Sequence, residues 1–267
     1  MLRDRLAVLA LALLGACASV PPAPPAAVSD LAPTGKLRAV INYGNPTLAK
    51  KDEAAGAPTG VSVDLARELA LRLGVEADLV TVTSAGASVE VLAAGRVDVG
   101  FFAIDPARAT TTTFTGPYVL LEGSYLVRND SPLKANEEVD REGIRVAVGN
   151  KSNYDLHLTR TLKKAKIERA PTSPEVVGYF LANRLDAAAG VKQQLEADAK
   201  RVGGVRLLPG RFMVIEQAMG VPKGRLAAQT WLSGFIEELK AGGFVAAALQ
   251  RHGVNGAAVA PPRLGGP

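Results

Sequence analysis

The chain has 267 residues, of which 31 are lysine or arginine and 26 are aspartate or glutamate, and its formal net charge is +5 at pH 7. The basic residues are scattered rather than clustered, which argues against a nucleic-acid partner. With one cysteine and two histidines, the chain cannot form an internal disulfide, and we expect neither a metal site nor any other cofactor.

The first 16 residues are typical of an export signal peptide. Arg3 and Arg5 precede an apolar run from Leu6 to Leu14, which at about nine residues is far shorter than the roughly 20 that span a bilayer. The segment Leu14-Gly15-Ala16-Cys17 resembles the bacterial lipobox, whose cysteine becomes the acylated N-terminus of the mature protein. We therefore predict a lipid anchor on Cys17 at the periplasmic or extracytoplasmic face; the alternative is an incidental cysteine of the signal region.

Residues 17–35 are rich in proline and alanine, a composition that buries little apolar surface and tends to stay extended. We expect this stretch to be a tether between the lipid and the folded body. The folded body is expected to run from about Lys36 to about Asn255, with residues 256–267 as a flexible tail. A body of about 220 residues is long enough for one large domain or two small ones.

The folded body alternates short apolar strands with amphipathic helices, which is typical of an α/β fold. Ser62 is expected to cap a helix that ends at Gly74, and Ser88 a short helix that ends at Gly95. The strands of this first half are expected at residues 37–41, 75–82 and 97–102.

The second half repeats this scheme. Ser152 and Asn153 are expected to open a helix that runs to about Lys163. The segment Ser173-Pro174-Glu175 places a proline at the start of a helix that is expected to end near Asn183. The remaining elements are expected at residues 144–148, 186–189 and 213–221 for the strands and at residues 226–239 and 243–250 for the helices.

A weak internal echo links the two halves, because Gly95–Gly100 matches Asn183–Ala188. In both segments a helix is expected to stop at a residue that tolerates left-handed geometry, and a strand begins at once. Two similar α/β lobes would explain the echo, as would chance agreement between common helix-to-strand junctions.

Five segments occur in a familiar order and spacing: Gly35–Arg38, Gly60–Ala66, Gly95–Asp98, Ile104–Arg108 and Phe114–Tyr118. Through them, and over roughly residues 35–253, the chain resembles the bacterial extracellular solute-binding proteins that serve polar-amino-acid ABC transporters. The resemblance implies an α/β, periplasmic-binding-protein-like (type II) clamp, in which two lobes are joined by two crossing hinge strands. Lobe 1 would be residues 36–126 plus 213–255 and lobe 2 residues 127–212, with the crossings at residues 125–128 and 213–218.

The function that the resemblance implies is that of a substrate-binding lipoprotein of an ABC uptake transporter. It would capture a small carboxylate-bearing solute, an amino acid or a related compound, and deliver it as a monomer to an ABC permease. We expect no enzymatic activity. The alternatives are a cyclohexadienyl-type dehydratase on the same fold, which needs a general acid in the cleft, and a free-standing solute sensor.

The resemblance places Arg108 on the carboxylate of the ligand, because a guanidinium offers a planar donor fork that matches a carboxylate. The alternatives for Arg108 are a surface position or an ion pair with Asp105. Ala103 stands where the family has Ser or Thr and would contribute its backbone N–H. Phe102 would wall the cleft or pack in the core. Ser152 and Asn153 would offer a helix N-terminus to an anion, or simply cap the helix.

The sequence departs from the family at the other half of the site. No acid follows the strand at residues 186–190, where the family pairs an aspartate with the amino group of the ligand. The first loop offers Asn42 and Asn45, and Ala85 stands where an aromatic residue is expected. Lys192 would add a second cation that favours a dicarboxylate or another anion; the alternative is a solvated lysine at a helix start.

Overall fold

The computed structural model describes residues 22–263. The predicted signal peptide, Cys17 and the first residues of the predicted tether lie outside the described residues. Within the described part of the chain, no helix is both long and apolar enough to span a membrane.

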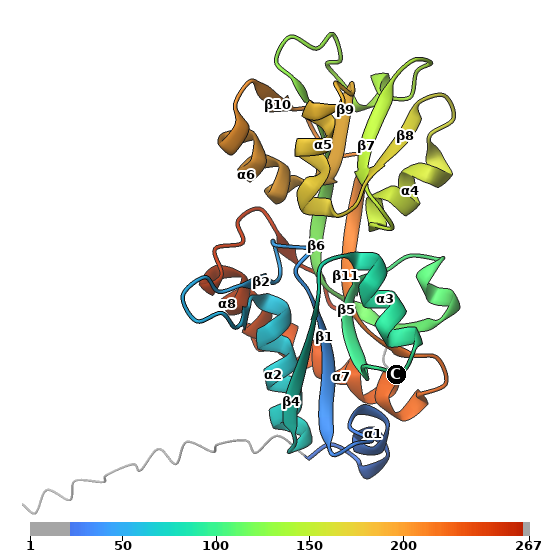
Figure 1. The fold of residues 1–267 in the computed structure, drawn as a ribbon. Helices are drawn as coiled ribbons and strands as arrows, with labels where there is room; N and C mark the ends of the chain where they lie inside the picture. The colour runs from blue at the N-terminus through green and yellow to red at the C-terminus, as the bar shows by residue number, and fades with distance from the viewer. Residues whose placement is uncertain (1–21, 264–267) are drawn as a thin grey trace, which may run out of the picture.

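The structure has two α/β lobes, as the resemblance implies, and two strands run from one lobe into the other (Figure 1). The strands of both lobes form one long mixed sheet. The strand order is β4-β1-β5-β11-β6-β9-β7-β8. The strands of lobe 1 are β1 Lys36–Asn42, β4 Glu76–Val82 and β5 Val99–Ala103, with the short β2 Lys50–Lys51, β3 Pro58–Thr59 and β12 Ala258–Val259. The helices of lobe 1 are α1 Pro25–Leu31, α2 Val61–Leu73, α3 Ala85–Ala93, η1 Arg108–Thr110, α7 Leu226–Ala241 and α8 Phe244–Arg251.

Lobe 2 repeats this architecture with a smaller sheet. Its parallel pairs are β7 with β8 and β7 with β9, the counterparts of β1 with β4 and β1 with β5. Its strands are β7 Arg145–Gly149, β8 Lys166–Ala170, β9 Ala187–Val191 and β10 Val205–Leu207. Its helices are η2 Asn136–Glu138, α4 Asn153–Thr161, η3 Ser173–Glu175, α5 Val176–Ala182 and α6 Lys192–Val202.

The lobes are joined by β6 (Thr112–Arg128) and β11 (Met213–Pro222). The two strands pair with each other from lobe 1 as far as Gly123 opposite Met213, and β6 then pairs with β9 and β10 of lobe 2. The predicted first crossing at residues 125–128 is therefore wrong, because these residues are already internal to the sheet of lobe 2. The chain crosses at residues 120–123 and 213–216, which also moves the boundary of lobe 1 back from residue 126.

Two helix caps differ from the prediction. Gly60, rather than the predicted Ser62, is the residue that precedes α2. Glycine suits this position because φ is +127° and a Cβ there would lie 2.4 Å from the Leu48 carbonyl oxygen. Ser84, not Ser88, caps α3 and accepts a hydrogen bond from the Ala87 N–H at 3.2 Å. The predicted end of α2 at Gly74 is confirmed, with a left-handed φ of +67°.

The predicted tether and tail are both shorter than expected, since chain on either side of the predicted body is folded. Pro25–Leu31 forms α1, which buries Leu31 completely. Asp30 accepts a hydrogen bond from the Ala228 N–H at 3.1 Å and so holds α1 at the start of α7. At the other end, β12 pairs with β6 and Ala260 is buried. Apolar residues on these two segments extend the core of lobe 1, which composition alone did not reveal.

The internal echo has a structural counterpart, shifted by one residue. Gly95 has φ +67° at the end of α3, but in lobe 2 the left-handed residue is Arg184 (φ +50°) rather than the predicted Asn183 (φ −93°). Arg96 N–H and Leu185 N–H then make equivalent hydrogen bonds back to Val91 and Phe180 carbonyls. The two lobes therefore use the same helix-to-strand junction.

We expect Arg184→Gly to stabilise the protein by about 0.5–1 kcal/mol, because glycine adopts positive φ without the steric cost that other residues carry. The side chain of Arg184 is exposed, so its removal costs little packing. Urea unfolding of the variant and of Asn183→Gly, where φ is negative, measures the effect. A loss of stability in Arg184→Gly would contradict the strain at this position.

Candidate functional site

A pocket of about 50 Å³ lies between the two lobes. It is lined from lobe 1 by the loop after β1 and by β5, from lobe 2 by the start of α4, and from β11 of the hinge. The lining residues named by the sequence prediction are Asn42, Asn45, Phe102, Ala103, Arg108, Ser152 and Asn153. These residues are as many as 111 positions apart in sequence (Asn42 to Asn153) and are brought together by the fold.

Arg108 lies in η1, directly after the end of β5, and is 5% exposed. Its guanidinium donates to the Ala103 carbonyl at 2.9 Å and, across the cleft, to the Lys151 carbonyl at 3.1 Å. Within residues 22–263, no carboxylate forms an ion pair with it. Burial lowers the pKa of Arg108 to about 10, with Asp105 acting in the opposite direction. A buried guanidinium held only by carbonyls is a site that an anion would stabilise.

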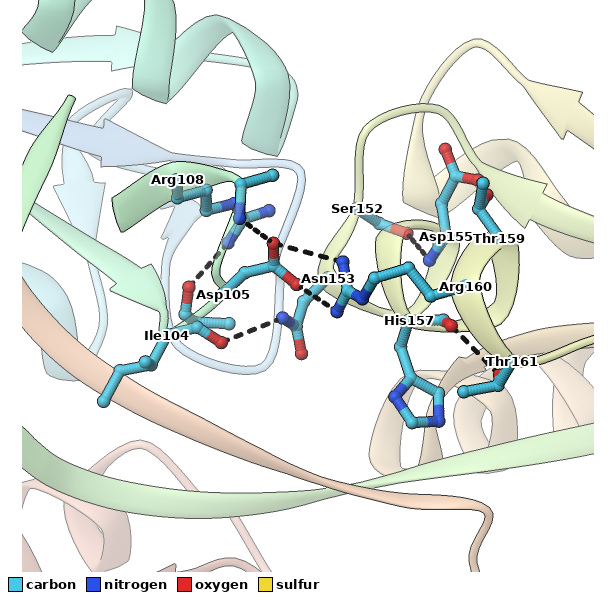
Figure 2. Close-up of polar contacts among 12 residues, drawn as sticks. Ile104, Asp105, Arg108, Ser152, Asn153, Asp155, His157, Thr159, Arg160 and Thr161 are labelled. Carbon is cyan, nitrogen blue, oxygen red and sulfur yellow. Dashed lines mark hydrogen bonds and ion pairs between the residues drawn. The ribbon is translucent and has the colours of Figure 1, made fainter. Parts of the chain in front are cut away.

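Asp105 does not pair with Arg108, so the structure does not support that alternative reading. The Asp105 carboxylate is 1% exposed and accepts from Arg160 of lobe 2 at 2.7 Å and from the Ala107 N–H at 2.8 Å. Figure 2 shows the pair reaching across the cleft, next to Arg108. A second cross-cleft ion pair joins Lys151 to Glu90 at 2.7 Å. The lobes are thus in direct contact, and the clamp is closed.

The start of α4 forms the lobe 2 wall of the pocket. Ser152 caps the helix by accepting from the Asp155 N–H at 3.0 Å, as one of the two predicted readings requires, and its side chain also lines the pocket. Asn153 is 7% exposed and its Nδ2 donates across the cleft to the Ile104 carbonyl at 3.2 Å. Its Oδ1 is buried and has no hydrogen-bond partner in the described part of the chain, which leaves an acceptor at the pocket.

Some of the predicted site residues of lobe 1 hold the local structure, and others leave polar atoms at the pocket. Asn42 uses its Oδ1 to accept from the Gly44 N–H at 2.8 Å and so shapes the turn. Asn45 has a buried Oδ1 that no described residue contacts through a hydrogen bond. Phe102 lines the pocket but is 3% exposed and meets Phe114 edge-on at 6.4 Å, so it both walls the cleft and packs in the core. The backbone carbonyl of Ala103 accepts a hydrogen bond from Arg108. The resemblance had implied a role for the Ala103 N–H.

The prediction that Lys192 points into the cleft is wrong. Its Nζ lies 2.9 Å from Glu122 Oε2, and Glu122 also pairs with Arg211 at 2.9 Å. The physical reason is that Lys192 opens α6 beside the crossing part of β6, where Glu122 offers an acidic partner. The pair raises the pKa of Lys192, chiefly through the hydrogen bond to Glu122. Lys192 is not among the residues that line the pocket.

Several lining residues escaped the sequence prediction, chief among them Gln217, Gln194 and Tyr154. Gln217 is 5% exposed and lies opposite Ala103 in the pairing of β11 with β5. A sequence signal for it does exist: Gln217 is a polar residue inside the apolar run Met213–Val221. Buried polar residues in such runs are uncommon without a partner.

The sequence profile of the bacterial extracellular solute-binding proteins, family 3, matches residues 37–255. The fold is similar to a putative binding component of an ABC transporter from Wolinella succinogenes, solved with lysine, with a TM-score of 0.71 at 24% identity over 82% of this chain and 95% of that one. It is similar to a solute receptor for L-cysteine of Neisseria gonorrhoeae, with a TM-score of 0.75 at 24% identity over 86% and 95%. An ancestral amino acid-binding protein that is a precursor of cyclohexadienyl dehydratase gives a TM-score of 0.72 at 24% identity over 84% and 98%. The predicted type II clamp fold is confirmed.

Proposed function

The chain belongs to family 3 of the bacterial extracellular solute-binding proteins, and from this premise we propose that it is the substrate-binding lipoprotein of an ABC uptake transporter. It captures a small carboxylate-bearing solute in the pocket between the lobes. The observation that carries the proposal is Arg108, a buried guanidinium at the pocket whose hydrogen bonds go to carbonyl oxygens. A carboxylate would balance the positive charge of Arg108 and accept hydrogen bonds from two parallel N–H groups of its guanidinium.

The receptor is favoured over the dehydratase by the chemistry of the pocket. Elimination of a hydroxyl group needs a carboxylic acid placed against the leaving group. Among the described residues, no lining side chain is an aspartate or a glutamate. The nearby Asp105 is engaged by Arg160. A free-standing sensor would use the same clamp, and a growth or uptake assay with the deleted gene separates it from a transport receptor.

The cellular setting follows from the same proposal. The protein would be held at the periplasmic or extracytoplasmic face by a lipid on Cys17 and would act there as a monomer. It would deliver its solute to an ABC permease. A thermal-shift screen of the folded body against amino acids, hydroxy acids, other organic acids and amines tests the class of solute, because a ligand of the native state raises apparent stability. Stabilisation by amines alone would overturn the carboxylate proposal.

We expect the clamp to be more open without its solute, because the cross-cleft pairs Arg160–Asp105 and Lys151–Glu90 can be replaced by contacts with water. Ligand should lower the radius of gyration measured by small-angle scattering. Arg160→Met removes the cross-cleft pair with Asp105 and should leave the empty protein more open, while Arg141→Met, at an exposed pair within lobe 2, should not. Equal radii for all three empty proteins and no change on binding would contradict a hinged clamp.

We expect Cys17→Ser to abolish membrane attachment, because serine offers no thiol for acylation. Fractionation of cells and labelling with a fatty-acid analogue measure the effect. The variant should appear in the soluble fraction or remain unprocessed, and label should be lost. Membrane attachment equal to that of the wild type would contradict the lipid anchor.

A further inference from the structure

The charge of the pocket is unbalanced. Of the described residues that line it, Arg108 is the one charged side chain, and the others are amides, hydroxyls and apolar groups. The two acids that lie close by are already paired: Asp105 with Arg160 at 2.7 Å and Asp155 with Arg169 at 3.0 Å. The pocket therefore presents a single positive charge to its occupant.

Two neutral side chains that line the pocket carry hydrogen-bond acceptors that no described residue satisfies. The Asn153 Nδ2 donates to the Ile104 carbonyl, which identifies the other amide atom as the oxygen (Figure 2). That oxygen is buried and has no partner among residues 22–263, and the same holds for the Asn45 Oδ1, which lies at the pocket from lobe 1. Leaving such acceptors unpaired costs free energy, so an occupant that donates a hydrogen bond to them is favoured.

The size of the pocket limits the occupant. Its volume is about 50 Å³ in the closed clamp. A space of this size suits a small solute, of which a carboxylate accounts for three non-hydrogen atoms. A donor group on so small a molecule must stand on a carbon next to the carboxylate or one removed from it.

We propose that the solute is a small 2-hydroxy monocarboxylate rather than a zwitterionic amino acid. The inference rests on the proposed function and specifies its substrate class. The carboxylate balances Arg108, and the hydroxyl donates to the amide oxygen of Asn153. The ammonium of an amino acid would instead be buried in a positively charged pocket without a counter-ion, which is costly.

Isothermal titration with matched pairs tests this preference. The probes are glycolate against glycine, both enantiomers of lactate against alanine, and glycerate against serine, with lactamide as the partner of lactate that lacks the charge. In at least one pair the hydroxy acid should bind about 10- to 100-fold more tightly than the amino acid, the range expected when a buried charged group is left unpaired. Lactamide should bind more weakly than lactate.

The variant Asn153→Asp provides a second test of the preference for hydroxy acids. It replaces the neutral acceptor with a carboxylate of the same shape, so the ratio of hydroxy-acid to amino-acid affinity should fall at least about tenfold. The hydrogen bond to Ile104 is lost for both ligands alike, and the ratio therefore isolates the charge. Asn150→Asp makes the same change at an exposed position of lobe 2 and should leave the ratio unchanged.

The outcomes distinguish failure of the hydroxy-acid inference from failure of the proposed carboxylate receptor. If no hydroxy acid binds at least about tenfold more tightly than its matched amino acid, or if the ratio is unchanged in Asn153→Asp, the hydroxy-acid inference is overturned while a carboxylate receptor stands. If no probe binds, or if lactamide binds as tightly as lactate, both the inference and the assignment of this pocket to a small carboxylate fall.

Discussion

Arg108→Ala should weaken solute binding by a factor between about 30 and several thousand. The guanidinium is buried, and removal of one partner of a buried, hydrogen-bonded charge pair costs about 2–5 kcal/mol, with about 1.4 kcal/mol for each factor of ten. Arg108→Lys should recover little of the affinity, because an ammonium lacks the planar fork that binds two carboxylate oxygens. Isothermal titration with a solute identified by thermal shift measures both variants.

The same substitution also removes a contact that closes the clamp, because Arg108 donates to the Lys151 carbonyl of lobe 2. The amide of the solute separates these two contributions. If Arg108 binds the carboxylate, the wild type discriminates against the amide and Arg108→Ala does not. If Arg108 only closes the clamp, both ligands weaken equally and the discrimination persists, which would contradict the assignment. Arg96→Ala removes an exposed arginine of the same lobe and should bind as the wild type does.

The pattern of apolar residues predicted most of the helices and strands of the two lobes, because periodicity reports which face of an element is buried. Seven of the eight ligand-binding residues that the family resemblance implied line the pocket, at strand ends and at the start of a helix, where α/β folds place ligands. The first crossing was misplaced because its position depends on pairing between distant strands. β6 is one continuous strand, and nothing local marks where it leaves one lobe and enters the other.

The sequence could not show which charged side chains pair with one another. Lys192 and Glu122 are separated by 70 residues, and Asp105 and Arg160 by 55. Each charge has several possible partners until the topology is known. Lys192 was assigned to the cleft because of its position after β9, whereas the start of α6 turns it towards the crossing strand. Contacts between distant charges depend on side-chain direction, which a linear pattern does not carry.

Asp98 provides the largest effect on stability that we expect from a single change in lobe 1. Its carboxylate is fully buried at the start of β5 and accepts from Arg38 on β1 at 2.8 and 2.9 Å. Arg225, just before α7, donates to it at 3.1 Å and also to the carbonyl of Asp30 on α1. The Asp98 carboxylate is therefore linked through Arg38 to the sheet of lobe 1 and through Arg225 to the start of α7 and to α1.

Asp98→Ala should destabilise the protein by about 2–4 kcal/mol and lower Tm by roughly 5–15 °C. Loss of one partner from a buried ion pair costs about 3–5 kcal/mol, and the value here is lower because Arg38 and Arg225 are 23% and 24% exposed and regain some water. Solute affinity should not change, since Asp98 is not among the residues that line the pocket. Urea unfolding and titration calorimetry measure the two quantities.

The repeated junction in lobe 2 supplies the matched control. Asp186 stands at the equivalent position, accepts from the Arg145 N–H at 2.8 Å and lies 3.8 Å from the Arg145 side chain. Its side chain is 38% exposed, so Asp186→Ala should cost less than about 1 kcal/mol, as is usual for exposed pairs. The two sites then differ in burial, in the second arginine and in the side-chain hydrogen bonds from the first arginine, which are made to Asp98 alone. Equal losses in the two variants would show that burial of Asp98 contributes nothing beyond the junction itself.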